Sequence, residues 1–291
     1  MEEVKEFKLD ARWRALLSLM DDESPNVRIG LLDELRARPK QAKIFLNWVS
    51  QGEDPLLMRH AQDIVKALGW IDGVGDFVRF IRSQRYELET GWLMLDRTVY
   101  PSFQASSVTL FLDMLAKRIR ELMTPPSNPV QTCSVLNRVL FHEFDFRGAR
   151  KEFENPENSF LHRVIARRRG LPITLSVLYI LTARRIGLEL EPIGLPGRFM
   201  VGCFKGDRPF YIDPWAGGKM WEVEQMEIHL DDSSVESSGA ALLPVTVSET
   251  LSRGCRNLVL HYRKKGDFSK SKTFQSFVEE FERVRKTAAN A

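Results

Sequence analysis

The pattern of hydrophobic and polar positions divides the chain into three zones. From residue 10 to residue 122, apolar residues recur at helical spacing, as in the sets Trp13, Leu16, Leu17, Met20 and Ile29, Leu32, Leu35. In DDESPNVR and again in GEDPLLMRHAQDIVKALG, a proline stands where a helix can begin, because the first helical turn tolerates proline. We therefore predict that residues 1–125 form a mainly helical region.

The second zone, residues 130–244, mixes helices with strands. Three prolines in TPPSNP, residues 124–129, interrupt the helical pattern. Helices are predicted near 130–142 and 158–169, and strands at 189–193, 198–204 and 209–213. The polar stretch DDSSVESSGAA, residues 231–241, has the composition of a solvated linker.

The third zone, residues 245–291, contains two further helical patterns. They cover Val247–Lys264 and Phe268–Lys286 and are joined at Gly266-Asp267. Each has an apolar stripe at helical spacing, which is typical of a core-facing surface. The stripe residues are Cys255, Leu258 and Tyr262 on the first helix, and Phe274, Phe277, Val278 and Phe281 on the second. We predict a C-terminal helical hairpin.

The segment RRRGLPITLSVLYILTARRIG predicts a helix over Pro172–Ile186. Gly170 is suited to end the preceding helix, and Gly187 to end this one. From Leu175 to Leu181 every residue except Ser176 is apolar or aromatic, so the helix must be buried on nearly all sides. Its N-terminus presents free backbone donors, and this is a position at which enzymes stabilise a thiolate.

Composition narrows the classes of protein to consider. The chain has 291 residues, 43% of them hydrophobic, and a formal net charge of only +3, so nothing in the overall charge favours nucleic acid. No segment reaches the apolar length of a membrane span, and the charged N-terminus MEEVKEFKLD is not a secretory signal. Three scattered cysteines indicate reduced thiols and a cytoplasmic protein, and the histidine spacing predicts no metal. No cofactor is expected.

Two of the helical zones resemble known repeats. The N-terminal elements, in which an Asp and a Pro precede a helix that carries an Arg, resemble degenerate HEAT-type hairpins, and the C-terminal pair resembles one tetratricopeptide-like hairpin. Such repeats are stabilised by stacking on their neighbours. Two units are fewer than a solenoid needs, so these helices are expected to pack against the rest of the protein.

The middle zone resembles a specific family. The matching features are FRG at residues 146–148, PENS at 156–159, RRRGLPITLS, ARRIGL, GLPGRF and IDPWAGG. They resemble the bacterial SirB-type family, whose central domain is transglutaminase-like. The resemblance implies an α+β fold in which the buried helix packs on a small antiparallel sheet.

The resemblance also implies where an active site would lie. Active members of the wider papain-like superfamily use a cysteine at the start of the buried helix, a histidine on the next strand and an aspartate one strand later. These positions fall here on Pro172, Arg198 and Asp213. Proline has no nucleophile, and arginine cannot act as a base. We expect the Arg198 guanidinium to form an ion pair with the Asp213 carboxylate, within about 4 Å.

Other polar residues of the middle zone could in principle replace the missing catalytic groups or bind a ligand. Cys203 is an odd number of residues from Arg198, so strand alternation directs it to the other face of the sheet. Thr174 and Ser176 lie within a turn of Pro172 but lack a base, and hydroxyls there usually cap or pack. His162 is expected to be a half-exposed polar helix residue. The basic cluster of Arg163, Arg167, Arg168, Arg169, Arg184 and Arg185 suits helix ends, where cations complement the dipole, more than nucleic acid.

Two classes of function follow from these residues. The first is a non-catalytic transglutaminase-like protein, a pseudoenzyme that contacts a protein partner and binds neither nucleic acid nor membrane. The second is a hydrolase or acyl-transferase with an unrecognised nucleophile. Loss of two of the three triad positions favours the first class over an enzyme. The two are distinguished by whether a thiol or hydroxyl lies within hydrogen-bond reach of an imidazole.

Overall fold

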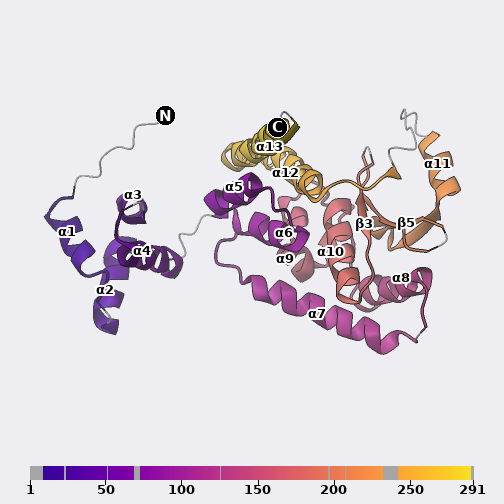
Figure 1. Ribbon diagram of the computed structural model, residues 1–291, viewed down its shortest axis with the longest axis horizontal. Helices are drawn as coiled ribbons and strands as arrows, with labels where there is room; N and C mark the ends of the chain where they lie inside the picture. The colour runs from indigo at the N-terminus through magenta and orange to yellow at the C-terminus, as the bar shows by residue number, and fades with distance from the viewer. Residues whose placement is uncertain are drawn as a thin grey trace. The chain divides into compact units, whose positions relative to one another are not determined.

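The computed structural model describes residues 9–22, 24–50, 52–68, 73–124, 126–195, 197–206, 208–231 and 242–289, without the side chains of Lys66, His229, Leu230, Asp231 and Ala289. The chain divides into two compact units, Met1–Asp72 and Gly73–Ala291 (Figure 1). The predicted boundaries at residues 125–130 and 244–245 both fall inside the second unit, so the three-domain division remains a prediction.

The first unit consists of four described helices. They are α1 (Ala11–Ser18), α2 (Pro25–Arg36), α3 (Pro39–Ser50) and α4 (Pro55–Ala67). Both prolines expected to begin helices, Pro25 and Pro55, do so. The side chain of Asp54 accepts the backbone N–H of Leu56 at 2.9 Å, which satisfies one of the free donors of α4.

The core of this unit is built around aromatic side chains. The rings of Trp13 and Phe45 lie 4.8 Å apart between their centroids, and both side chains are buried. Ile29 shares helical spacing with Leu32 and Leu35 but is 58% exposed, while Leu31 is buried in its place. Helical spacing alone does not say which of two neighbouring stripes faces the core.

The second unit is mainly helical with a small sheet, as the sequence predicts. Its helices are α5 (Gly73–Ser83), α6 (Leu88–Arg97), α7 (Ala105–Leu122), α8 (Pro129–Asn137), α9 (Leu161–Arg167), α10 (Pro172–Arg185), α11 (Val223–Asp231), α12 (Val247–Lys264) and α13 (Phe268–Ala289). Short helical turns, η1 (Arg138–Glu143), η2 (Pro156–Ser159) and η3 (Pro214–Ala216), connect several of them. The α+β fold class is confirmed.

Helix α10 is the buried centre of this unit. Every residue from Ile173 to Ala183 is buried, and the helix packs against α6, α7, α9 and α12 as well as β3 and β4. The N–H groups of Gly187 and Leu188 donate to carbonyls of the last turn, and Gly187 has a φ of 80°. A glycine tolerates this left-handed conformation, so the predicted stop at Gly187 is confirmed.

The main sheet has four antiparallel strands in the order β3-β4-β5-β6. They are β3 (Glu191–Ile193), β4 (Met200–Cys203), β5 (Phe210–Asp213) and β6 (Lys219–Glu222). Val201, opposite Ile212, belongs to the same core cluster as α10. Tyr211, opposite Trp221, belongs to a second cluster with Met226 of α11. Because successive side chains point to opposite faces, one face of the sheet packs on α10 and the other on α11.

Several predicted elements differ from those observed. Helix α9 ends at Arg167, and Arg168, with a φ of 58°, takes the left-handed position that was expected at Gly170. Gly170 instead pairs with Gly148 in a two-residue parallel ladder, β1 (Arg147–Gly148) with β2 (Arg169–Gly170). The strands at 189–193 and 198–204 are shorter than predicted, so Arg198 precedes β4. Strand β6 and helix α11 were not predicted, and residues 232–241 of the expected linker lie outside the described residues.

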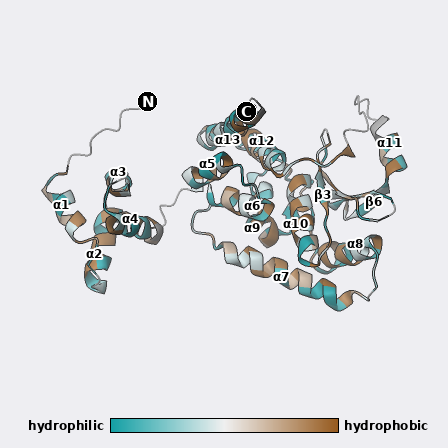
Figure 2. Cartoon of the chain, in the orientation of Figure 1, coloured by the Kyte–Doolittle hydropathy of each residue, from teal (hydrophilic) through white to brown (hydrophobic). Residues whose placement is uncertain are grey.

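The C-terminal hairpin forms as predicted. Helices α12 and α13 pack against each other, and all seven predicted stripe residues are buried. Figure 2 shows hydrophilic and hydrophobic residues alternating along α13, as expected for a helix with one buried face. Phe77 of α5 packs edge-on against Phe277, with centroids 5.0 Å apart. The hairpin therefore packs against α5 and α6.

Candidate functional site

The turn before β4 holds Arg198 in place. Arg198 N–H donates to the carbonyl of Leu195 at 3.2 Å, and Gly197 has a φ of 66°, a conformation that favours glycine. From α12, the guanidinium of Arg253 donates to the same Leu195 carbonyl at 2.7 Å. A Cβ at Gly194 would lie too close to Arg253, so the first glycine of GLPGRF makes room for this contact.

Arg198 and Asp213 form the ion pair that the sequence predicts. Arg198 Nη2 lies 2.5 Å and Nε 3.1 Å from Asp213 Oδ2. The other carboxylate oxygen accepts the N–H of Ala216 at 3.2 Å and so caps η3. Asp213 is fully buried, whereas Arg198 keeps 29% of its side chain exposed. The carboxylate is therefore shielded from solvent completely, and the guanidinium only in part.

Aromatic and cationic side chains surround the pair. The Cζ atom of Arg198 lies 5.5 Å from the centroid of the Trp221 ring, and Nζ of Lys219 lies 3.6 Å from the same centroid. Lys219 is the cross-strand partner of Asp213, so the two residues share a face of the sheet with Trp221. This is the face that packs on α11. Two cations and an indole thus occupy the surroundings of the single carboxylate.

The start of α10 carries no acid–base group. Pro172 is its first residue. The hydroxyl of Ser176 donates to the carbonyl of Phe199 at 3.4 Å and so connects the helix to the residue before β4. Thr174 is fully buried, and its hydroxyl has no hydrogen-bond partner among the described residues. Neither hydroxyl contacts an imidazole.

The three thiols are free, buried and poorly ionised. Burial raises the pKa of Cys133 to about 12, and it also raises the pKa values of Cys203 and Cys255. Cys203 Sγ donates to the backbone carbonyl of Lys205 at 3.7 Å. Cys203 shares the α10 core cluster with Val201, the opposite face from Asp213, as alternation predicts. A raised pKa opposes formation of the thiolate that is needed for nucleophilic attack.

His162 has a partner that the sequence analysis missed. Its Nδ1 lies 2.8 Å from Oδ2 of Asp96, and the carboxylate also accepts the N–H groups of Leu161 and His162. Asp96, which lies on α6, therefore caps the N-terminus of α9. Burial raises the pKa of Asp96, against the hydrogen bonds that lower it. The sequence does contain a sign of this contact. Asp96 follows Trp92 by one helical turn, so an acidic residue lies on the buried stripe of α6 and needs a polar partner.

A second polar connection joins α10 to the IDPWAGG segment. The Tyr179 hydroxyl donates to Asn137 Oδ1 at 2.9 Å, and Asn137 Nδ2 donates to the carbonyl of Gly218 at 2.8 Å. Gly218 has a φ of 81°, and a Cβ there would collide with Asn137. The last glycine of the motif is thus required both by its conformation and by the close approach of Asn137.

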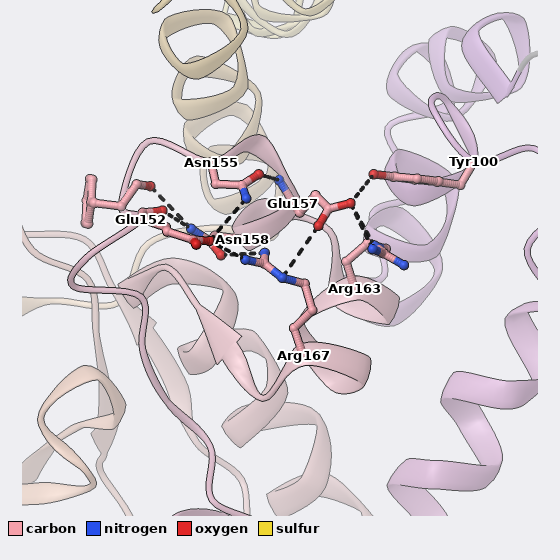
Figure 3. A network of polar contacts seen from close by, with 8 residues as sticks. Tyr100, Glu152, Asn155, Glu157, Asn158, Arg163 and Arg167 are labelled. Atoms are coloured by element: carbon pink, nitrogen blue, oxygen red, sulfur yellow. Dashed lines mark hydrogen bonds and ion pairs between the residues drawn. The ribbon is translucent and has the colours of Figure 1, made fainter. Parts of the chain in front are cut away.

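The PENS segment is the centre of a charged network (Figure 3). Glu157 lies between the Tyr100 hydroxyl, Arg163 and Arg167, with Arg163 Nη2 at 2.9 Å from Oε1. Arg167 also donates to Asn158 Oδ1 at 2.9 Å and to Glu152 at 2.8 Å. Two members of the predicted basic cluster therefore pair with carboxylates of the chain itself.

Across the described side chains, no hydroxyl or thiol forms a hydrogen bond with an imidazole. His162 pairs with Asp96, and the Nδ1 atom of His261 has no partner in this part of the chain. Among the same residues, no three His, Cys, Asp or Glu side chains are grouped closely enough to hold a metal ion. The arrangement around Asp213 can orient and neutralise a carboxylate, but among the described residues it includes no imidazole to exchange a proton with a nucleophile.

Comparison with known proteins places this geometry in a family. A model of the transglutaminase-like superfamily matches residues 106–256, more than half of the chain. The chain belongs to the transglutaminase-like superfamily. The matched region contains α10, the four-stranded sheet and both members of the Arg198–Asp213 pair. No solved structure matches the chain.

Relatives of known sequence match a little less than half of this chain. The chain is 31% identical over 138 residues to a UPF0162 protein of Xylella fastidiosa, which covers 46% of this chain and 48% of the relative. It is 26% identical over 132 residues to a UPF0162 protein of Vibrio cholerae, covering 45% of this chain and 49% of that protein. It is also 30% identical over 144 residues to F-box only protein 21 of Homo sapiens, covering 47% of this chain and 22% of that one. The similarity thus spans about half, or less, of each relative's length.

The described helices do not have the dimensions of membrane spans. None of those in the described parts of the chain combines the length and the apolar character that crossing a bilayer demands.

Proposed function

We propose that this chain is a non-catalytic member of the transglutaminase-like superfamily that acts through contact with a protein partner. The observation that carries the proposal is the ion pair between Arg198 and Asp213. A triad needs an imidazole that takes a proton from the nucleophile and is oriented by the carboxylate. A guanidinium remains protonated at any usable pH, so the carboxylate here orients a group without catalytic capacity.

The candidate nucleophiles of the described chain support the same proposal, because none of them is activated. Pro172 stands where the resemblance expects the cysteine, and burial raises the pKa values of all three thiols. The hydroxyls of Thr174 and Ser176 have no base beside them. These contacts argue against the alternative, a hydrolase or acyl-transferase with a displaced nucleophile.

The relatives support a role in protein contact. The matched segment makes up 22% of F-box only protein 21, so a domain of this kind also occurs as one part of a longer protein. We assign the chain to the SirB-type branch, with HEAT-like helices before the domain and a tetratricopeptide-like hairpin after it. Three free, buried cysteines without a disulfide suit a reducing compartment, and we infer a bacterial cytoplasmic protein.

A turnover assay tests the proposal. The purified chain is incubated with glutamine-containing peptides and a labelled amine, and separately with amide, ester and peptide substrates. Product formation is expected to equal that of the heat-denatured protein. Turnover above this background that is lost in Cys203→Ser, Ser176→Ala or Thr174→Val would contradict a non-catalytic role and identify the nucleophile.

A further inference from the structure

A groove in the second unit has cations as nearly all of its charged lining residues. It has a volume of about 950 Å³ and lies where β1, the following loop, α9 and η3 meet. The side chains on which its chemistry depends, here called the basic groove, are Arg147, Arg150, Lys151, Arg167, Arg169 and Trp215. Glu152 is the one carboxylate in its lining. The lining thus combines five cations with one anion, far from the near-neutral balance of the whole chain.

The carboxylates of the chain itself show what these cations bind. Asp145 lies 2.6 Å from Arg147 and 3.4 Å from Arg169, so one carboxylate is shared by two guanidinium groups. At the other end, Glu152 pairs with Arg167 at 2.8 Å. Guanidinium groups suit carboxylates because their donors form a planar fork.

Two cations of the basic groove remain without a carboxylate. Within the part of the chain that the structure describes, Arg150 and Lys151 have no acidic group within 4 Å, and both are exposed. The Cζ atom of Arg150 lies 6.0 Å from the centroid of the Trp215 ring. Both side chains are therefore available to a ligand at the wall formed by the indole.

The indole wall is fixed in position and continues into a second aromatic ring. A Cβ at Gly148 would lie 2.6 Å from the Trp215 ring, so the indole rests directly against the backbone of β1. Phe153, which is 44% exposed, meets Trp215 edge-on with centroids 5.6 Å apart. An apolar side chain of a ligand can pack here beside the free cations.

We propose that the basic groove binds an acidic peptide segment of a partner protein, with carboxylates on Arg150 and Lys151 and an apolar side chain against Trp215 and Phe153. Asp145 on Arg147 and Arg169, and Glu152 on Arg167, are carboxylates that cations of this groove already bind, so the two free cations favour further carboxylates. This proposal rests on the proposed role in protein contact and names the chemistry of the partner.

Fluorescence anisotropy tests the proposal with a labelled peptide of six glutamates around a central phenylalanine. Arg150→Glu with Lys151→Glu is expected to weaken binding at least tenfold at low salt. The matched control, Lys272→Glu with Lys286→Glu on α13, changes the net charge equally and is expected to alter affinity less than twofold. Thermal melts of both double variants should match the original chain, because none of these four exposed side chains has an ion pair in the described structure.

Three outcomes would overturn it. Equal weakening by both double variants would make the binding a general effect of charge. Displacement of the peptide by 10 mM inorganic phosphate would show a site for small anions, and tighter binding of a single-stranded DNA oligonucleotide that the groove variant abolishes would show a nucleic-acid site. These outcomes concern binding only, whereas the non-catalytic role is tested by the turnover assay. Failure of the groove proposal is therefore distinct from failure of the non-catalytic role.

Discussion

Arg198 differs from a histidine in the property that decides the chemistry of this site. An imidazole exchanges a proton near neutral pH, whereas a guanidinium holds its proton and presents several donors at once. Here two of those donors meet one oxygen of Asp213, and the other oxygen caps η3. The residue therefore fixes the end of β5 and compensates a fully buried charge.

The cysteines give a prediction at the same scale. Because burial raises the pKa of Cys133 to about 12 and also raises the pKa values of Cys203 and Cys255, iodoacetamide at pH 7.5 should modify none of them in the native chain. Mass spectrometry should detect three alkylated cysteines only after denaturation. Rapid native labelling of one cysteine, removed by its substitution with Ser, would indicate an activated thiol and contradict the account.

His261 predicts how stability depends on pH. Burial lowers the pKa of this nearly inaccessible imidazole below its usual 6.5. The unfolded chain therefore binds a proton at a higher pH than the folded chain does, and stability is lost as the pH falls below about 6.5. His261→Leu should remove this contribution, which amounts to at most about 1.4 kcal/mol per pH unit.

Urea unfolding between pH 7.5 and pH 5 measures the effect. The exposed His142, changed to Gln, serves as the matched control for the loss of one imidazole. If the profiles of the original chain and of His261→Leu run parallel, His261 does not contribute to the pH dependence.

At the scale of elements, glycines mark where two segments approach closely. Gly218 and Gly266 have nearly the same backbone conformation, with φ of 81° and 78°, but only Gly218 has a side chain, that of Asn137, against it. Gly266→Ala should cost about 1 kcal/mol for the left-handed conformation alone. Gly218→Ala should cost about 1–2 kcal/mol more, because it also disrupts the hydrogen bonds of Asn137.

Unfolding free energies of the two variants give the comparison directly. Addition of Asn137→Ala to Gly218→Ala should recover part of the difference, since the steric conflict is removed. Equal costs for the two glycine substitutions would show that Asn137 gives way without loss.

The elements also show how far a sequence can be interpreted. Helix α10 and the C-terminal hairpin were predictable because an all-round apolar run and a regular stripe each specify burial. Strand β6 was not, since its residues are mostly half-exposed and pair at one edge of the sheet. The end of α9 was misplaced because Arg168 adopts a left-handed conformation, stabilised by the Phe111 and Phe146 rings 4.5 and 4.7 Å from its guanidinium carbon.

The ion pair of the candidate site could be predicted from the sequence, but the residues that surround and support it could not. The Arg198–Asp213 pairing was expected because the family resemblance carried by GLPGRF and IDPWAGG places these two residues at neighbouring triad positions. The roles of Arg253, Asn137 and Asp96 depend on contacts across 58, 81 and 65 residues of chain, which no local pattern specifies. The buried acidic residue on α6 was the one indication of such a contact in the sequence itself.

At the scale of the whole molecule, the two compact units have separate hydrophobic clusters. A chain of residues 73–291 should therefore fold without residues 1–72 and unfold in one cooperative transition, because its core is complete. Circular dichroism and thermal unfolding of this fragment check the expectation. A fragment without a cooperative transition would show that the second unit depends on the first.

The central claim is that Arg198 and Asp213 form a structural ion pair in place of a catalytic one, and a double-mutant cycle measures it most directly. Arg198→Ala leaves the buried Asp213 carboxylate uncompensated and should cost about 3 kcal/mol, near the lower end for a buried pair because Arg198 is partly exposed. Arg198→His can still donate to the carboxylate and should cost clearly less. Combined with Asp213→Asn, Arg198→Ala should show a coupling free energy of about 1–3 kcal/mol. Equal stabilities of the Ala and His variants, together with a coupling near zero, would contradict the account.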